Sequence, residues 1–553
     1  MPTTDESLQW IVETLKVVNN NIVHLDARLT LMERSLTKTL MHGQVRQTFG
    51  LPSLPPPRTE GEIGQPRFIV TLTSYGSRIA STAPNAIWSI LQQSVLPDRI
   101  ILWLGHDETI SPQLRVLQEH GLEIRFCDDI GPYTKLIPAL REFPNDVLIT
   151  VDDDLYYPRG WFVQLKNAYL RDPTKIYCHR ADEITLDPAL RIQPYLFWKF
   201  RSANADTPQG RILLTGIDGV LYPPNALHPS VLDERKFMAL APQNDDVWFT
   251  VMAKLQGTPI AFVSNAGSER GPELHEEGGE MPLAYENLAE RADRQLAAVL
   301  SEFHELYGWL EPSHIKMKLD LNDLVQRNIF FSGCWEKNAV EILLKIFPEQ
   351  GVFFDIGANV GTYALNFAQK AKQVFAVEAC LATHTKLAET VRANGLTNVL
   401  CYYNAVASVD GAELVIYKAE ANSVGSNSVY RQQDEDVPLN TVMTVTLDTI
   451  VANNRIDRLD LIKIDVEGGE LSALHGGELS IARFRPFIFA ELNPVTCQRA
   501  GHTTIDLFNY ITQDLHYTPT FIVGESFVPI ADYAEYSDLL LDVFFIPAEK
   551  LKL

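Results

Sequence analysis

The feature that most constrains the fold is the segment Val352–Gly361, which reads Val-Phe-Phe-Asp-Ile-Gly-Ala-Asn-Val-Gly. Its apolar start predicts a buried strand, and its glycines predict a tight loop that leads into a helix. Such a loop lets backbone N–H groups approach a nucleotide-like ligand, because no side chain stands in the way. A carboxylate, Glu378, follows the apolar run Gln373–Val377 after about twenty residues, a spacing that suits an acid binding ribose hydroxyls.

A second signal lies about a hundred residues further on, in the segment Leu461–Glu470, which reads Leu-Ile-Lys-Ile-Asp-Val-Glu-Gly-Gly-Glu. The glycine loop, Glu378 and this DVEGGE run together point to S-adenosylmethionine. On these motifs, residues 311–553 resemble an FkbM-family methyltransferase. The resemblance implies a Rossmann-like α/β domain that transfers a methyl group from S-adenosylmethionine.

The resemblance also suggests roles for the residues of this glycine loop. Asp355 is expected to meet the methionine amine, and Gly357 and Gly361 to let the backbone approach the cofactor. Asn359 is expected to steer the loop. Asn404 would lie beside the adenine in a chain of this family, although a turn residue at a strand end explains it equally well.

The DVEGGE run follows a predicted strand that ends at Ile464. It delivers Asp465 and Glu467 to the carboxyl edge of the sheet, where ligands bind in this architecture. These are the candidate catalytic residues, and the roles of base, metal ligand and acceptor clamp all remain open. Lys463 points to the same side of the strand as Asp465 and could tune it, and Glu491 is a further acid on the acceptor side.

Length, charge and cysteine content narrow the class of protein. The 553 residues leave room for further domains before this one. A net charge of −23 argues against nucleic acid as a partner. No apolar run approaches the ~18 residues of a membrane span, and the N-terminus lacks the pattern of a signal peptide. The 6 cysteines form no C-x-x-C pair, so we expect reduced thiols in a soluble, cytoplasmic protein.

Residues 1–45 carry the pattern of a coiled coil. Apolar residues recur at alternating spacings of three and four, as an a/d seam requires; they are Leu8, Ile11, Leu15, Val18, Ile22, Leu25, Leu29, Met32 and Leu36. Leu at a with β-branched residues at d favours a homotrimer or homotetramer weakly over a dimer, through residues 8–36. An amphipathic helix lying on its own domain is the alternative. Residues 46–65, rich in Pro and Gly, then read as a semi-stiff linker.

Residues 66–310 predict a second α/β domain with a parallel sheet, because strand-like and helical segments alternate from Arg67 onward. One apolar strand ends abruptly at Val151 and is followed by Asp152, Asp153 and Asp154. Adjacent carboxylates repel one another unless a cation or solvent neutralises them. Mg²⁺ or Mn²⁺ bridging a nucleotide diphosphate would do so, and a solvated acidic turn is the alternative.

The motifs of this region resemble, in order, a GT-A-type glycosyltransferase of the bacterial family-2-like kind. They are Thr71–Tyr75, Tyr133–Pro138, Val151–Asp154, Gly219–Asn225 and Pro242–Trp248. The resemblance implies a sugar-nucleotide donor and a glycan acceptor, with the Asp triplet as the metal-binding D-x-D motif. Asp152 and Asp154 are then the expected ribose and metal contacts, and Asp153 either points outward or shares the metal.

Further donor and acceptor contacts are expected around this triplet. Thr73 ends the first strand, where the base and ribose should lie, and Arg78 follows as a further donor-binding residue. Lys135 could place its ammonium on the diphosphate, although an exposed helix lysine is an equal alternative. Asp245 and Asp246 open a helix, and one of them is the candidate base for the acceptor hydroxyl; helix capping is the alternative.

The whole chain is therefore expected to be bifunctional. One domain would add a glycosyl unit to a surface polysaccharide or other glycan, and the other would methylate a sugar hydroxyl. The alternative is a methyltransferase whose first domain is a non-catalytic glycan-binding or scaffold module.

Overall fold

The computed structural model describes residues 67–263, 291–418, 427–430 and 437–550, and these form two compact units. Unit 1 contains residues up to 207 together with 212–302, and unit 2 contains 208–211 and the chain from 303 onward. The expected coiled coil over 1–45 and the linker over 46–65 lie outside the described residues, so both remain predictions.

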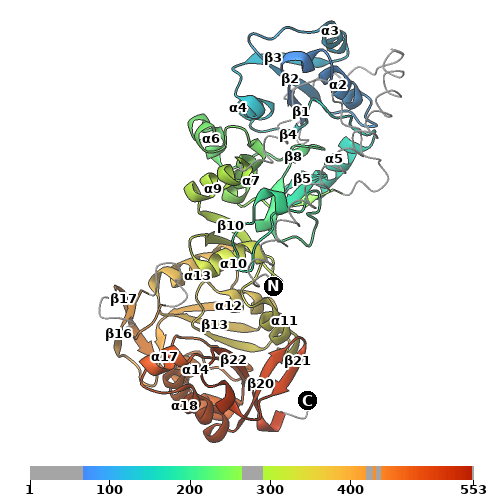
Figure 1. Cartoon of the computed structure of the whole chain (residues 1–553). Coiled ribbons are helices and arrows are strands. Elements are labelled where there is room, and N and C mark those ends of the chain that lie inside the picture. Colours follow the sequence, from blue (N-terminus) through green and yellow to red (C-terminus); the bar gives the residue numbers. More distant parts are fainter. Residues whose placement is uncertain (1–66, 264–290, 419–426, 431–436, 551–553) are drawn as a thin grey trace, which may run out of the picture. The chain divides into compact units, whose positions relative to one another are not determined.

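Unit 1 is built on a mixed sheet of seven strands in the order β3-β2-β1-β4-β8-β5-β9 (Figure 1). The strands are β1 Phe68–Thr73, β2 Arg99–Gly105, β3 Leu122–Cys127, β4 Val147–Thr150, β5 Ile176–Cys178, β8 Val220–Tyr222 and β9 Ile260–Phe262. β1 pairs in parallel with β2 and β4, whereas β8 is antiparallel to both β4 and β5. A two-stranded antiparallel sheet, β6 Ala181–Glu183 with β7 Ile212–Leu214, lies outside this sheet. The expected parallel α/β arrangement is therefore present from β1 to β4, and β8 departs from it.

Helices follow the strands of unit 1 as the hydrophobic pattern predicts. They are α2 Ala83–Leu91, α3 Pro112–Gln118, α4 Ile137–Glu142, α5 Trp161–Arg171, α6 Glu234–Leu240, α7 Asp245–Gln256 and α9 Arg291–Glu302. Alternate residues of β1, such as Val70 and Leu72, pack against Ile87 of α2 and Phe162 of α5 in one apolar cluster. Burial of this strand on both faces accounts for its nearly uninterrupted apolar sequence.

Unit 2 contains a sheet of eight strands in the order β14-β13-β12-β18-β19-β22-β20-β21. These strands are β12 Val352–Ile356, β13 Gln373–Glu378, β14 Val399–Tyr403, β18 Leu461–Ile464, β19 Phe487–Leu492, β20 Tyr517–Val523, β21 Ser526–Pro529 and β22 Leu541–Pro547. The five strands from β14 to β19 are parallel, and β22 is antiparallel to β19. The order reverses at β12, as in Rossmann-like sheets, so a ligand site is expected at its carboxyl end.

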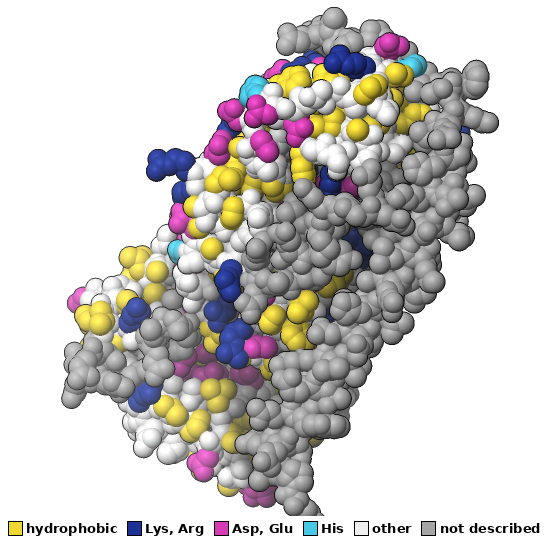
Figure 2. Space-filling model, turned by 45° about the horizontal axis from the view of Figure 1, so that its top comes forward, with side chains coloured by type: hydrophobic (Ala, Val, Ile, Leu, Met, Phe, Trp, Pro, Cys, Tyr) yellow, Lys and Arg dark blue, Asp and Glu magenta, His cyan; other side chains and the backbone are white. Residues whose placement is uncertain are grey.

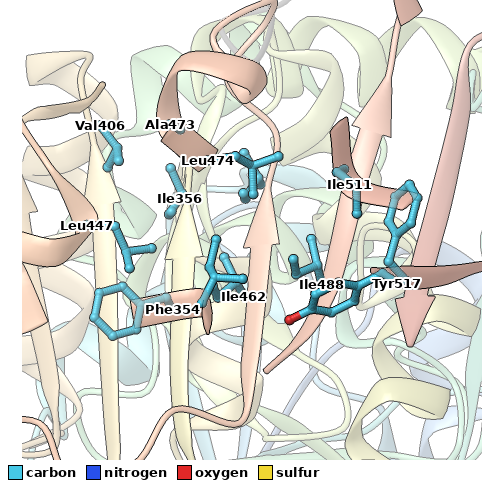
Figure 3. Close-up of a cluster of buried hydrophobic side chains, with 14 of the residues drawn as sticks. Phe354, Ile356, Val406, Leu447, Ile462, Ala473, Leu474, Ile488, Ile511 and Tyr517 are labelled. Carbon is cyan, nitrogen blue, oxygen red and sulfur yellow. The ribbon is translucent and has the colours of Figure 1, made fainter. Parts of the chain in front are cut away.

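Helices cover both faces of this sheet (Figure 1). They are α10 Leu324–Ser332, α11 Lys337–Ile346, α12 Thr362–Phe367, α13 Leu381–Ala393, α14 Leu447–Asn453, α15 Glu470–His475, α16 Glu478–Phe484, α17 Pro494–Arg499 and α18 Thr504–Asn509. Figure 3 shows Phe354 and Ile462 of the sheet packed beside Leu447 of α14 in the main apolar cluster. Phe353 faces the other way and lies 4.4 Å, ring to ring, from Phe367 of α12.

The boundary between the units lies at residues 302 and 303, not at 310 and 311 as the sequence suggested. The reason is a hairpin of β10 Glu305–Leu310 and β11 Ile315–Asp320, which belongs to unit 2. Its residues are buried alternately, as in a strand with one buried face. A further small sheet of unit 2 contains β15 Ala405–Val406, β16 Glu413–Tyr417 and β17 Pro438–Val445.

Hydropathy and surface charge can be followed over the described residues. Within the described part of the chain, no helix combines the length and the apolar character that crossing a bilayer requires. On the face drawn in Figure 2, the described Lys and Arg side chains form small groups among Asp and Glu, without a continuous basic surface.

Candidate functional site

A cavity of about 760 Å³ opens in unit 2 at the carboxyl ends of β12, β13 and β18. One wall is formed by the glycine loop after β12 and by Glu378. A second wall, which adjoins the first where Gly357 packs against Asp465, is formed by the DVEGGE run and by Glu491. The two motifs that the sequence singled out, about a hundred residues apart, therefore share one cavity.

The glycines of the loop serve close packing within the chain. Gly357 has a φ of 81°, and a Cβ there would overlap the backbone carbonyl oxygen of Asp465. Gly361 has a φ of 97° and precedes α12, and a Cβ there would overlap the side chain of Leu387. Gly357 lines the cavity but Gly361 is not among its lining residues. The expected approach of a ligand thus concerns Gly357, while Gly361 allows α12 to pack on α13.

Asn359 and Glu378 join the loop to the end of β13. The Asn359 backbone N–H donates to Glu378 Oε2 at 2.8 Å, and both residues line the cavity. The other oxygen, Oε1, accepts hydrogen bonds from the Cys380 N–H and the Thr383 hydroxyl. A carboxylate has about four lone-pair sites, so Glu378 keeps capacity for ribose hydroxyls. Burial raises its pKa.

Asp355 and Asn404 also hold the local structure. Asp355 Oδ2 accepts from the Ala364 N–H of α12 at 2.9 Å, and burial raises its pKa to about 6. Its Oδ1 has no hydrogen-bond partner among the described residues, but the carboxylate lies behind the loop and does not line the cavity. Its contact with a methionine amine stays a prediction. Asn404 lines the cavity and donates to the Met443 carbonyl at 3.0 Å. Both the contact with adenine and the role of a turn residue at a strand end therefore remain open for it.

The DVEGGE run turns sharply after β18. The Glu470 carboxylate accepts the backbone N–H groups of Val466 and Gly468, which fixes the turn. Glu467 takes a φ of 55°, and its carbonyl accepts a hydrogen bond from the Ser428 hydroxyl at 2.9 Å. The turn directs Asp465 and Glu467 into the cavity.

Three carboxyl groups meet on this wall. Oxygen atoms of Asp465, Glu467 and Glu491 all lie within 4.8 Å of one another, so they could share one cation. Burial, followed by the charge of Asp465, raises the pKa of Glu467 to about 8 and that of Glu491 to about 10. These two acids therefore carry protons at neutral pH in the folded chain.

Lys463 lies beside Asp465 in the lining of the cavity. Burial works against its charged form, but the charges of Asp465 and Asp355 outweigh burial and raise its pKa. Its ammonium donates to Asp465 Oδ2 at 3.1 Å. The placement on the same side of the strand as Asp465, expected from the period of two, is confirmed.

Several cavity residues carry no signal in the sequence. They come from α12 and from segments before β12 and after β19, and include Trp335, Glu336, Tyr363, Arg499, Asp538 and Leu540. The Tyr363 hydroxyl donates to Glu336 Oε2 at 2.6 Å, which links α12 to the start of α11. No motif could have identified these residues, because long-range packing alone brings them to the cavity.

Unit 1 also has an edge at which predicted residues meet. β1 lies between β2 and β4, so the connections leave it in opposite directions and create a switch point at its carboxyl end. Thr73 ends β1, and the Asp triplet follows β4 on the same edge. Thr73 Oγ1 donates to the Trp103 carbonyl of β2 at 3.0 Å.

Cations of the chain itself neutralise the Asp triplet. Asp153 is buried and accepts from the Ser74 hydroxyl at 2.6 Å and from Arg78 at 3.0 Å, so the outward orientation is wrong. Asp154 lies 3.4 Å from the Arg78 guanidinium. Asp152 accepts from the Lys135 ammonium at 3.0 Å.

Lys135 is a buried residue, so the alternative of an exposed helix lysine is wrong. Its ammonium lies 3.0 Å from both Asp152 Oδ1 and Asp245 Oδ2. Asn244 caps α7 through the Val247 N–H, while Asp245 and Asp246 occupy the first turn. Burial, followed by the charge of Asp245, raises the pKa of Asp246 well above its ordinary value.

The metal expected at Asp152 and Asp154 stays a prediction. Within the residues that the structure describes, the group of three side chains able to share an ion lies at Asp465, Glu467 and Glu491. The triplet carboxylates contact Lys135 and Arg78, so side chains of the protein already offset part of their charge.

Comparison with known proteins concerns unit 2. Residues 355–519 match the model of the methyltransferase FkbM domain. The hexuronic acid methyltransferase AglP of Haloferax volcanii is 30% identical over 142 residues, which cover 26% of this chain and 56% of that protein. The chain thus spans about half the length of the curated relative it matches.

Solved structures show weaker likeness. A methyltransferase FkbM from Methylobacillus flagellatus KT is 13% identical, with 93% of this chain and 99% of that chain covered at a TM-score of 0.24. TYW2 from M. jannaschii, solved with AdoMet, is 13% identical, with 44% and 87% covered at a TM-score of 0.22. Such scores do not establish a common fold. Residues 355–519, which match the methyltransferase FkbM domain model, lie within the Rossmann-like part of unit 2.

Proposed function

We propose that unit 2 methylates a hydroxyl group of a sugar, with S-adenosylmethionine as the methyl donor. The observation that carries this proposal is the shared cavity. The glycine loop and Glu378 form one wall, and Asp465, Glu467 and Glu491 form the other. A donor held on the first wall would direct its methyl group toward acids that can accept or hold protons.

The residues of the first wall fit the donor. Glu378 retains lone pairs for ribose hydroxyls, and the backbone of Gly357 lines the same cavity. When bound, S-adenosylmethionine supplies a methyl group on a sulfonium centre, which is open to in-line attack. We expect micromolar affinity, about −8 kcal/mol.

On the second wall, Asp465 is the proposed base. Its carboxylate pairs with the Lys463 ammonium at 3.1 Å, whereas the raised pKa values of Glu467 and Glu491 favour protonated acids that can donate to sugar oxygens. Asp465 would accept the proton of the attacking hydroxyl as the methyl group transfers. A sugar acceptor agrees with the name of the Haloferax volcanii relative, whose acceptor is described as a hexuronic acid.

The direct test of the donor is calorimetric titration of the full chain with S-adenosylmethionine. We expect heat of binding with one site, and the same site should bind S-adenosylhomocysteine. Replacing Glu378 by Gln removes the charge that ribose hydroxyls would meet and should weaken binding. Absence of binding to the unaltered chain would reject the proposal.

A second candidate function, sugar transfer by unit 1, is favoured by the cluster at its switch point. Lys135, Asp152 and Asp246 converge around Gly216, where a Cβ would meet all three side chains. Burial raises the pKa of Asp246, which is the direction expected of a general base, whereas Asp245 pairs with Lys135. This candidate rests on the resemblance of the motifs and on this geometry.

Hydrolysis of sugar nucleotides tests the second candidate. We expect slow release of nucleoside diphosphate by the full chain, lost when Asp246 is replaced by Asn. Asp172→Asn is the matched control, because Asp172 is a partly exposed residue that pairs with Lys175 away from this cluster. Addition of a chelator shows whether a divalent metal takes part. Equal hydrolysis by both variants would reject Asp246 as the base, and absence of hydrolysis by the unaltered chain would leave unit 1 as a binding module.

A further inference from the structure

Unit 1 contains a buried guanidinium for which its own chain provides few hydrogen bonds. Arg180 follows the end of β5, and 11% of its side chain is exposed. Its Nε and Nη1 atoms are buried and have no hydrogen-bond partner in the described part of the chain. A buried charged donor without acceptors costs free energy, so this arrangement requires an explanation.

The neighbouring acid compensates this charge weakly. Asp182 Oδ1 lies 3.9 Å from Arg180 Nη2, which is beyond hydrogen-bonding distance. The Asp182 carboxylate instead accepts from the Arg201 backbone N–H at 2.8 Å, and burial raises its pKa. Arg180 therefore keeps N–H donors in the fork that suits carboxylate or phosphate oxygens.

Arg180 lies on the same sheet edge as the proposed transfer site. β4 and β5 are both antiparallel to β8, so their carboxyl ends point to one edge. Tyr195 lies near enough to Arg180 and Asp246 for both charges to act on its pKa, which burial, followed by the charge of Asp182, raises.

Exposed aromatic rings lie next to this tyrosine. The Tyr195 ring is 5.1 Å from the rings of Trp198 and Phe200. Phe200 is 41% exposed and Phe197 is 53% exposed, although large apolar side chains are usually buried. An aromatic face offers an apolar surface to the C–H face of a pyranose ring.

We propose that Arg180 and the segment Tyr195–Phe200 bind an acidic sugar unit. The guanidinium would donate hydrogen bonds to the oxyanion, and the exposed rings would pack against the face of the sugar. A uronic acid carboxylate and a sugar phosphate present the same oxygen pair to an arginine fork. The guanidinium must turn for its buried nitrogens to reach the ligand. This binding does not depend on whether unit 1 transfers a sugar.

Calorimetric titration of the full chain tests the proposal with three probes: methyl glucuronide, glucose 1-phosphate and neutral methyl glucoside. We expect an acidic probe to bind more tightly than the neutral one, and the stronger of the two acids identifies the oxyanion. Arg180→Met should weaken acid binding at least about tenfold, since a charge-assisted hydrogen bond is lost. Phe200→Ala should weaken it as well.

Arg191→Gln is the matched control, because the Arg191 side chain is 76% exposed and pairs with Asp187. It should bind the acidic probes as the unaltered chain does. If Arg180→Met also binds them unchanged, or if no acidic probe binds at millimolar concentration, the proposal is overturned.

Thermal unfolding distinguishes a binding role from a structural one. A binding arginine that lacks partners can be replaced by Met without loss of stability, so we expect an unchanged or raised midpoint for Arg180→Met. If Arg180→Met unfolds at a lower temperature than the unaltered chain, the binding test is made with Arg180→Lys, which keeps the charge and loses the planar fork. Weakened acid binding by a stable Arg180→Lys chain supports the proposal, and unchanged binding contradicts it.

Discussion

Lys463 Nζ lies 3.1 Å from Asp465 Oδ2, and this ion pair forms the floor of the cavity in unit 2. The same ammonium donates to the Gly357 carbonyl at 3.2 Å and lies 4.0 Å from Asp355 Oδ1. One cation thus connects the glycine loop with Asp465 of the DVEGGE run. Because Lys463 is buried, no solvent can replace its charge.

Replacement of Lys463 by Met should therefore destabilise unit 2. The change leaves Asp355 and Asp465 without their cation, and breaking a buried pair costs about 3–5 kcal/mol. Urea unfolding of the full chain measures this loss. Lys463→Arg keeps the charge and should retain more of the stability, and equal losses in both variants would show that shape rather than charge matters.

The stability of unit 2 should fall as the pH rises. In the folded chain the pKa of Glu467 is raised to about 8 and that of Glu491 to about 10, above the ordinary value of 4.5. Between these values the folded chain binds protons that the unfolded chain has released, so the free energy of unfolding decreases with pH. The stabilisation is complete below the ordinary value and is lost as the pH passes through the raised values.

The double change Glu467→Gln with Glu491→Gln tests this pH dependence, because an amide does not titrate. Unfolding free energies at pH values from about 6 to 9 should decline less steeply in the variant than in the unaltered chain. Glu535→Gln is the control, since Glu535 is exposed. Parallel curves for all three chains would contradict the proton-holding role of the two acids.

Gly357→Ala should impair both folding and donor binding. A methyl group at this position would overlap the Asp465 carbonyl, and its φ of 81° is unfavourable for alanine. Gly395→Ala is a close control, because Gly395 has a φ of 65° and open space around its Cα. We expect a lower unfolding midpoint and weaker S-adenosylmethionine binding for Gly357→Ala, with a small stability loss alone for Gly395→Ala.

The seam over residues 8–36, outside the described residues, predicts association of the chain. Replacing Leu15, Ile22 and Leu29 by Asp would place like charges in the seam and should separate the oligomer. Light scattering of the full chain should then show a smaller mass. An unchanged mass would favour a helix that packs on its own domain.

The sequence predicted the parts of the fold that depend on local pattern. β12, its glycine loop and β18 lie where the apolar runs and glycines placed them, and Asp465 and Glu467 reach the expected sheet edge. From the sequence we expected Gly361 to let a ligand approach, whereas in the structure its missing side chain leaves room for Leu387. The pattern identifies a tight backbone approach but not the partner.

Long-range packing decided what the sequence could not supply. Trp335 and Arg499 reach the cavity from segments far from both motifs. The neutralisation of the Asp triplet by Arg78 and Lys135 depends on side chains that converge from different loops. Adjacent carboxylates in a sequence indicate that a cation is needed, and they do not say whether a metal or a side chain provides it.

Methyl transfer itself tests the central claim most directly. The full chain is incubated with S-adenosylmethionine carrying a labelled methyl group and with a panel of neutral and uronate-containing oligosaccharides. We expect the labelled methyl group to appear on the oligosaccharide as an alkali-stable ether, as methylation of a hydroxyl requires. S-adenosylhomocysteine should form in an equimolar amount. Asp465→Asn should lower the rate by about 10²–10⁴ while donor binding persists, and Asp457→Asn, an exposed control, should not. Label released by alkali as an ester, or an undiminished rate for Asp465→Asn, would contradict the account.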